Sequence, residues 1–347
     1  MIKLRLEKST KKLKLNKMIR LTWLNLPVLL CSIFINFSCK PDEHSILPKI
    51  TGSAGEVLLI LEKYRWEHEV GAEFRNLLSQ YHAALPQPEP IFDLIHVPPA
   101  QFSKIFQSHR NIIFTRIGSQ YSEPKIVVQR NMFATPQIIM NVQAPNDSAC
   151  VALLRQSGNE IIKRINRSEL NRIAGNYKKS QVQEIVTTLK EKHNLTLYIP
   201  KGYTIDLNVD DFVWIALETP LTTQSILIYY YQYTDTNTFT PDYLVEKRNQ
   251  YLKKYVPGPV PGTYMATEDL VPVEFKELTY KDRYFAELRG LWKLENGFMG
   301  GPFVSLSTVD EKQNRVVTVE GFVYAPRDKK REFLRQVRSI LYTLEFH

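Results

Sequence analysis

The chain has 347 residues, which is enough for two domains or for one large domain. Hydrophobic residues make up 44% of it and charged residues 23%, a composition that excludes disordered and collagen-like chains. Most of the formal net charge of +9 lies in residues 1–38, which carry eight bases and one acid. The remainder is nearly neutral, so we expect no nucleic-acid partner.

Residues 1–38 are predicted to be a signal peptide. A basic stretch precedes a hydrophobic run over residues 21–37, and a small residue follows the run. Met18 is an alternative start that would leave a compact basic leader. The alternative to cleavage is an uncleaved membrane helix, but the run is barely long enough and Pro27 interrupts it.

Cys39, at the end of this run, resembles the lipobox cysteine of bacterial lipoproteins, whose thiol receives a diacylglyceryl group. The residues that follow, Lys40-Pro41-Asp42-Glu43, are similar to the surface-export tag of Bacteroidetes lipoproteins. The resemblance implies lipid attachment at Cys39 and a location in the cell envelope. We expect this to be the outer membrane, on its periplasmic face or at the cell surface. Residues 39–55 contain scattered Pro and Gly and are expected to form a flexible tether.

Residues 56–192 are predicted to form an N-terminal α+β domain that ends in long helices. Short hydrophobic runs predict strands at 57–61, 92–97, 111–117, 124–129 and 137–142. Helical spacing predicts helices at 70–81, 99–107 and 147–192. The last is capped by Asp147 or Ser148 and is expected to break near 166–168 and 178–180. Cys150, within it, is expected to be a buried apolar residue.

Residues 193–347 are predicted to form a C-terminal α+β domain. Strands are expected at 195–199, 212–217, 225–233, 271–279, 284–294, 303–309 and 315–324. Helices are expected to follow Thr240-Pro241, as far as Tyr255, and to cover 328–344. The predicted fold class is therefore α+β, with two α/β sandwich-like domains that have mainly antiparallel sheets and flanking helices.

Common catalytic and metal-binding motifs are missing from the sequence. It contains no Gly-x-Ser-x-Gly, no phosphate-binding Gly loop with Lys, and no His-Glu-x-x-His. The seven His residues are never within four positions of one another. We therefore expect neither a metal site nor a cofactor.

A glycine-rich stretch over residues 289–303 is the first candidate binding site. Glycine allows tight turns and close approach, so a loop here could present large side chains to a ligand. The alternative is that the glycines only turn one strand into the next. The candidate residues are Arg289, Trp292, Phe298, Met299, Gly300 and Gly301.

Tyr229, Tyr231 and Tyr233 form a second candidate, an aromatic face. They alternate along one predicted strand, so their rings share a face and could stack on sugars or peptides. The alternative is that they cover a half-buried sheet.

Carboxylates on the later strands form the third candidate. Strand pairing could bring Glu287 and Glu295 together, with Glu320 nearby, as acid and base catalysis requires.

Five segments together resemble an uncharacterised lipoprotein family of Bacteroidetes, domain of unknown function 4837. They are Leu85-Pro86-Gln87-Pro88-Glu89-Pro90, His109-Arg110-Asn111-Ile112, and residues 289–292, 299–303 and 321–326. The resemblance spans nearly the whole mature chain and implies an envelope location, but it supplies no catalytic residues. Separately, the order of elements over 195–347 is similar to the Mog1/PsbP-type sandwich, an analogy of fold only.

These patterns favour a membrane-anchored envelope lipoprotein that is a non-catalytic binding or assembly module. Its partners would be the membrane, through the N-terminal lipid, and an envelope protein or glycan. The alternative is an envelope hydrolase that uses a carboxylate pair near Glu287 and Glu295.

Overall fold

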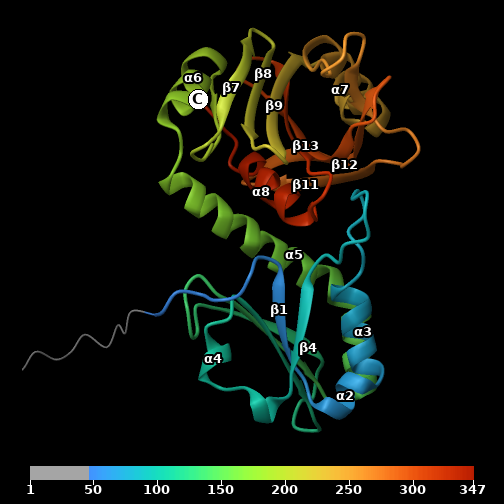
Figure 1. Cartoon of the computed structure of the whole chain (residues 1–347). Helices are drawn as coiled ribbons and strands as arrows, with labels where there is room; N and C mark the ends of the chain where they lie inside the picture. The colour runs from blue at the N-terminus through green and yellow to red at the C-terminus, as the bar shows by residue number, and fades with distance from the viewer. Residues whose placement is uncertain (1–46) are drawn as a thin grey trace, which may run out of the picture. The chain divides into compact units, whose positions relative to one another are not determined.

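The computed structural model describes residues 47–347 (Figure 1). The predicted signal peptide and the lipidation site Cys39 lie outside the described residues. Within that range, no helix is both long enough and hydrophobic enough to cross a membrane.

The first sheet has five strands in the order β2-β1-β3-β5-β4. The strands are β1 (Glu56–Ile60), β2 (Asp93–Val97), β3 (Asn111–Ile117), β4 (Lys125–Arg130) and β5 (Ile138–Ala144). The first four strands of that order pair in parallel, whereas β4 pairs antiparallel with β5. Parallel neighbours require crossover connections; helices lie between β1, β2 and β3 in the chain, whereas β4 connects β3 to β5.

Both faces of this sheet are covered, so its strands read as hydrophobic runs. One face packs on α3 (Glu69–Leu78) and α5 (Asp147–Lys179), with Phe74 and Leu154 in the shared core. The other face is covered more thinly, by phenylalanine rings near the short α4 (Lys104–Gln107). The remaining short helices of this region are α2 (Lys63–Glu67) and η1 (Pro99–Gln101).

The described part of the predicted tether, residues 47–55, is attached to the first sheet. Lys49 forms a bridge with Thr135, and Thr51 forms one with His109. The Thr51 amide also donates to the Ser108 carbonyl at 2.8 Å. The prediction of a flexible tether is therefore wrong for this stretch, because its backbone groups pair with the fold.

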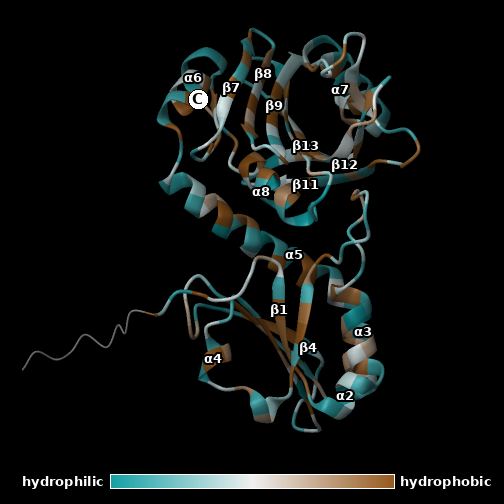
Figure 2. Cartoon of the chain, viewed as in Figure 1, coloured by the Kyte–Doolittle hydropathy of each residue, from teal (hydrophilic) through white to brown (hydrophobic). Residues whose placement is uncertain are grey.

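Helix α5 is continuous over 33 residues. The predicted break at 166–168 is wrong: Ile165 and Leu170 are buried on either side of it, and Arg172 binds Glu169 one turn apart at 3.0 Å. The N-cap is Asn146, whose side chain accepts from the Ala149 amide, rather than Asp147 or Ser148. Figure 2 shows hydrophobic and hydrophilic residues alternating along α5, as expected for a helix with one buried face. Cys150 is fully buried in it.

The second sheet has eight strands in the order β10-β12-β13-β14-β9-β8-β7, and β11 also pairs with β12. Every pairing within it is antiparallel. The strands are β7 (Thr204–Val209), β8 (Phe212–Glu218), β9 (Thr223–Gln232), β10 (Tyr264–Thr267), β11 (Glu274–Tyr280), β12 (Arg283–Glu295), β13 (Gly300–Asp310) and β14 (Arg315–Tyr324). A small third sheet pairs β6 (Leu195–Thr196) with β15 (Glu345–Phe346).

Helices cover both faces of the second sheet. The hydrophobic side chains of α6 (Gln183–His193) and α8 (Arg331–Leu341) join one core, and those of α7 (Pro241–Tyr255) join the core on the opposite face, beside η2 (Thr236–Phe239). The α+β class with sandwich-like layers and mostly antiparallel sheets is thus confirmed. The difference is the first sheet, where three of the four pairings are parallel.

One ion pair is completely buried under α7. Arg248 donates from Nε and Nη2 to the two carboxylate oxygens of Glu320 at 2.9 and 2.7 Å, and neither side chain is exposed. The guanidinium also lies 3.6 Å from the centre of the Phe303 ring and donates to Thr267. The pair joins α7 to β14, and each charge depends on the other because water cannot reach either.

We predict that Arg248→Met lowers the free energy of unfolding by about 3–5 kcal/mol, because it leaves the Glu320 carboxylate buried without a partner. The double variant Arg248→Met/Glu320→Leu should recover most of this loss. Arg155→Met, which removes an exposed pair with Glu73, is the control and should cost about 1 kcal/mol or less. Urea unfolding would measure all three, and a double variant weaker than Arg248→Met would contradict the prediction.

Candidate functional site

The predicted aromatic face is covered by the protein itself. Tyr229 is 2% exposed, and Tyr231 and Tyr233 pack into the core beneath α7 and η2. Tyr229 stacks on Tyr251 of α7 with ring centres 4.9 Å apart. These rings therefore hold α7 against the sheet and are not free to stack on a ligand.

The glycine-rich stretch forms a turn between β12 and β13, and its residues do not line one pocket. Trp292 is buried and donates from its ring nitrogen to the Val323 carbonyl at 3.1 Å. A Cβ atom at Gly301 would collide with the same carbonyl, so this glycine allows close strand packing. Met299 is half-buried and packs on the core, Gly300 is exposed, and Phe298 is fully exposed. The turn therefore serves mainly to pack two strands, and only Arg289, further along β12, faces a cavity.

The predicted carboxylate pair is not formed. Glu287 and Glu295 lie eight residues apart on β12, which separates them by roughly 26 Å at the usual rise of a strand. Glu320 faces α7, whereas Glu287 faces α8 on the opposite side of the sheet. These carboxylates therefore cannot act as a catalytic pair, since carboxyl groups that act together lie within about 5–9.5 Å.

Two adjoining cavities instead form a groove between α5, α8 and the strands β11 and β12. The larger, of about 690 Å³, is lined by seven Arg or Lys residues and two Glu. The smaller, of about 240 Å³, is lined by four Arg and one Glu. They share Ile162, Asn166, Arg289 and Arg338, so we treat them as one site, the basic groove.

A buried carboxylate, Glu287, holds the two shared arginines. Arg289 Nε donates to Glu287 Oε1 at 2.9 Å, and Arg338 Nε donates to Oε2 at 3.0 Å. The Tyr342 hydroxyl donates to Oε2 at 2.8 Å. The Glu287 side chain has no exposed surface, whereas those of Arg289 and Arg338 are 21% and 17% exposed. One negative charge thus positions two positive ones, and among the described residues no acceptor binds the Nη1 of either arginine.

The electrostatics of the groove follow from this arrangement. Burial would raise the pKa of Glu287, but Arg338 and Arg289 outweigh it and lower the pKa to about 2. At Lys276 of β11 burial lowers the pKa, and the neighbouring charges of Arg289, Lys163 and Arg338 lower it further, although Glu287 opposes them. Crowded positive charge of this kind is stabilised by a bound anion.

Arg167 of α5 adds a further unpaired cation. Its guanidinium lies 3.9 Å from the centre of the Tyr280 ring, and its buried Nη1 has no hydrogen-bond partner among the described residues. Arg167 lines the larger cavity, so its guanidinium adds to the positive charge that an anion there would meet.

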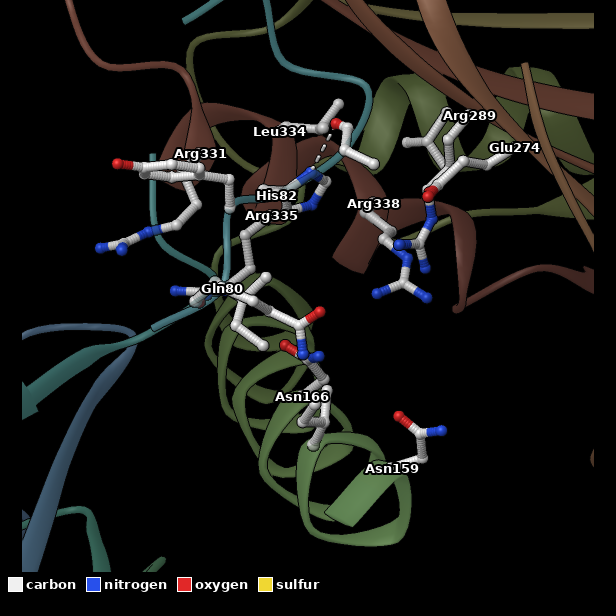
Figure 3. A pocket seen from close by; sticks show the side chains of 15 residues that line it. Gln80, His82, Asn159, Asn166, Glu274, Arg289, Arg331, Leu334, Arg335 and Arg338 are labelled. Carbon is white, nitrogen blue, oxygen red and sulfur yellow. Dashed lines mark hydrogen bonds between the residues drawn. The ribbon is translucent and has the colours of Figure 1, made fainter. Parts of the chain in front are cut away.

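The smaller cavity also contains uncharged polar groups. His82 Nδ1 lies 3.3 Å from the Ala83 carbonyl, which only accepts, so Nδ1 carries the proton and Nε2 is an acceptor. Burial lowers the pKa of His82 to about 4, and Arg289 and Arg338 act in the same direction, so the imidazole is neutral at pH 7. Figure 3 shows Asn159 and Asn166 extending from α5 on the side of Arg289 and Arg338.

Sequence reasoning identified Arg289 of this site, and Glu287 in a different role, as half of a carboxylate pair. A signal for Arg338 was available: Arg331, Arg335 and Arg338 repeat at helical spacing along α8. The first two form ion pairs, Arg331 with Asp93 and Arg335 with Glu332. The contributions of His82, Asn159, Arg167 and Lys276 depend on tertiary contacts and have no local signature.

The arrangement offers positive charge to an anion. In the described part of the chain, no three His, Cys, Asp or Glu side chains are grouped so as to hold a metal ion. The one buried carboxylate of the groove is fully engaged with arginines and has a lowered pKa, which makes it a poor base.

Fold and site together define a protein with two main sheets and a basic groove. Residues 182–343 match the model of the family described as Domain of unknown function (DUF4837), the family that the sequence resembles, but the match covers this region and not nearly the whole mature chain. Residues 51–178 match a second family, described as Domain of unknown function (DUF8532). No curated protein matches the chain.

Two solved structures show weak likeness. The human StarD13 (DLC2) lipid transfer and protein localization domain is 11% identical, with 46% of this chain and 95% of that chain covered and a TM-score of 0.22. A crystal structure from Bacteroides thetaiotaomicron VPI-5482 is 10% identical, with 45% and 46% covered and a TM-score of 0.20. At these scores neither likeness supports an argument about fold or function.

We predict that the Glu287 ion pairs stabilise the fold above pH 4.5 and that this stabilisation is lost as the pH falls toward 2. The pKa of the carboxyl group is lowered from 4.5 in the folded state, so folding favours its ionised form, by about 3 kcal/mol at neutral pH. Glu287→Gln should therefore destabilise the protein strongly at pH 7 and much less at pH 3.

The matched control is Glu274→Gln, which changes an exposed carboxylate on β11. Urea unfolding at several pH values would measure both variants. Parallel pH profiles for Glu287→Gln and the wild type would contradict the prediction.

Proposed function

We propose that this protein is a lipid-anchored module of the cell envelope that binds an anionic ligand in the basic groove without catalysis. The observation that carries the proposal is the concentration of positive charge in one concave site. The chain from residue 39 onward has a net charge near +2, yet seven basic residues and only two acids line the larger cavity. Positive charge gathered in a concave site raises the local concentration of anions.

The groove has features of a binding site in addition to its charge. Its larger cavity has a volume within the range of about 300–1,000 Å³ that is typical of ligand pockets. Glu287 fixes the Arg289 and Arg338 side chains before any ligand arrives, which reduces the entropic cost of binding. Because arginine forks match the geometry of carboxylates and phosphates, either anion is a suitable ligand.

The proposed location rests on the leader and on Cys39. A thiol directly after a hydrophobic run, followed by a polar stretch, is the pattern of a lipoprotein signal. Attachment of two or more acyl chains would hold the protein firmly at a membrane, because each buried CH₂ contributes about 0.8 kcal/mol. We place the protein at the outer membrane, where its partner would be an envelope glycan or protein.

We predict that the double variant Arg167→Gln/Lys276→Gln loses affinity for anionic probes by tenfold or more, since each charge-assisted contact contributes about 1.5–3 kcal/mol. Neither side chain has an ion-pair partner among the described residues, so the variant should fold normally. Isothermal titration calorimetry with inorganic polyphosphate and with oligogalacturonate, at low and high salt, would measure the change.

The control is Lys104→Gln/Lys125→Gln, which removes the same charge from exposed positions on α4 and β4. Its affinity should equal that of the wild type. Equal losses in the two double variants, or no binding of either probe by the wild type at low salt, would overturn the proposed site.

For the lipid anchor, we predict that Cys39→Ser moves the protein out of the membrane fraction or leaves its leader uncleaved, because serine cannot form the thioether. Cys31→Ser, within the leader, should have no effect and is the matched control. Cell fractionation and mass spectrometry of the N-terminal peptide would test this. A wild-type chain with an unmodified Cys39 and residues 1–38 still attached would refute it.

A further inference from the structure

We infer that the ligand of the basic groove is an anionic glycan, whose hydroxyl groups bind the uncharged side chains of the smaller cavity while its charged groups bind the arginines and lysines. This inference rests on the proposed function of the groove. It adds the chemical class of the ligand, which positive charge alone does not specify.

The first argument is that the smaller cavity presents acceptors as well as donors. His82 Nε2 is an unprotonated acceptor, since Nδ1 donates to Ala83. The amide groups of Asn159 and Asn166 each offer an oxygen and an NH₂ group, and no described residue is hydrogen-bonded to them. Ionised phosphate and carboxylate groups only accept hydrogen bonds, so they cannot donate to these acceptors, which otherwise bind water. A sugar hydroxyl both donates and accepts, and it satisfies the whole set.

The second argument is the position of the two asparagines. Asn159 and Asn166 lie seven residues apart, two turns along the same side of α5. Asparagine is a poor helix former, so the helix itself gains nothing from either residue. Both line the groove, and Asn166 contributes to both cavities. Asn159 is exposed and Asn166 is half-buried, so both amides are open to a ligand in the groove.

The third argument is the length of the site. Along α5 the lining residues run from Asn159 in the smaller cavity to Leu170 in the larger one, which spans about 16 Å at 1.5 Å per residue. A single phosphate ion would occupy only a fraction of this length. An extended chain can instead place hydroxyl groups near His82 and charged groups near Arg167 and Lys276.

The experiment compares the double variant Asn159→Ala/Asn166→Ala with the wild type in calorimetric titrations of three probes. Oligogalacturonate carries both hydroxyl and carboxylate groups, its methyl ester carries hydroxyl groups without charge, and inorganic polyphosphate carries charge without hydroxyl groups. We expect the variant to bind oligogalacturonate roughly tenfold more weakly, because it loses at least two hydrogen bonds. Its affinity for polyphosphate should be unchanged, and the methyl ester should bind neither protein measurably.

Misfolding can be separated from loss of contact. Alanine is the best helix former, so both substitutions should preserve α5 or strengthen it. Thermal unfolding of the variant would verify this. Gln156→Ala/Asn176→Ala removes two exposed amides from the same helix outside the groove, and its affinity for oligogalacturonate should match that of the wild type.

Two results would overturn the inference. The first is an equal affinity of the Asn159→Ala/Asn166→Ala variant and the wild type for oligogalacturonate. The second is an equal loss for oligogalacturonate and polyphosphate. In both cases the groove would still bind anions through Arg167 and Lys276, so the proposed function would survive. It would fail separately if the wild type bound none of the probes.

A final comparison distinguishes a free glycan from one attached to lipid. Vesicles of phosphatidylcholine containing lipopolysaccharide, and the oligosaccharide released from that lipid, would be tested for binding in parallel. Binding to both supports recognition of the glycan itself. Binding to the vesicles alone overturns it, because the protein would then be recognising the lipid surface.

Discussion

The structure depends most on one buried carboxylate, Glu287, which must satisfy two guanidinium groups and one phenol hydroxyl. A buried charge is tolerated only when it is paired and fully hydrogen-bonded, so Glu287 fixes α8 against β12. The same constraint sets the electrostatics of the groove, because two positive charges share one negative charge. Glu287 therefore links the stability of the fold to the positions of the two arginines that line the groove.

Charged and uncharged polar side chains lie in different parts of the groove, and the proposed binding gives them different roles. Cations that lack an ion-pair partner among the described residues, Arg167 and Lys276, line the larger cavity, whereas His82 and Asn159 provide uncharged groups in the smaller one. The first set supplies long-range attraction, and the second supplies directional hydrogen bonds at short range. Arg331 and Arg335 have the same charge but are occupied by Asp93 and Glu332, so counting arginines would overstate the positive field of the site.

Much of the fold could be predicted from the sequence because its strands and helices have clear periodicity. The hydrophobic stripe of α8 and the hydrophobic runs of β9 and β14 were sufficient to predict these elements. Strand β7 is missing from the predicted strands, although the alternation of Ile205, Leu207 and Val209 indicates it. The site was harder to predict than the fold. Tyr229 and Trp292 look like ligand contacts in the sequence, but both are buried and pack in the core. Asn159 and Arg338 line the same cavity only because α5 and α8 pack together, and no local pattern contains that information.

The uninterrupted course of α5 also has a consequence for how the chain can be divided. The first family region ends at residue 178, and the second begins at residue 182. Yet Leu170 and Tyr177, which precede this border, pack in the hydrophobic core of the second sheet. Expressing residues 182–343 alone would remove these two side chains from that core and leave apolar surface open to water. The end of α5 therefore belongs structurally to the second sheet, although its earlier residues pack in the separate core of the first sheet.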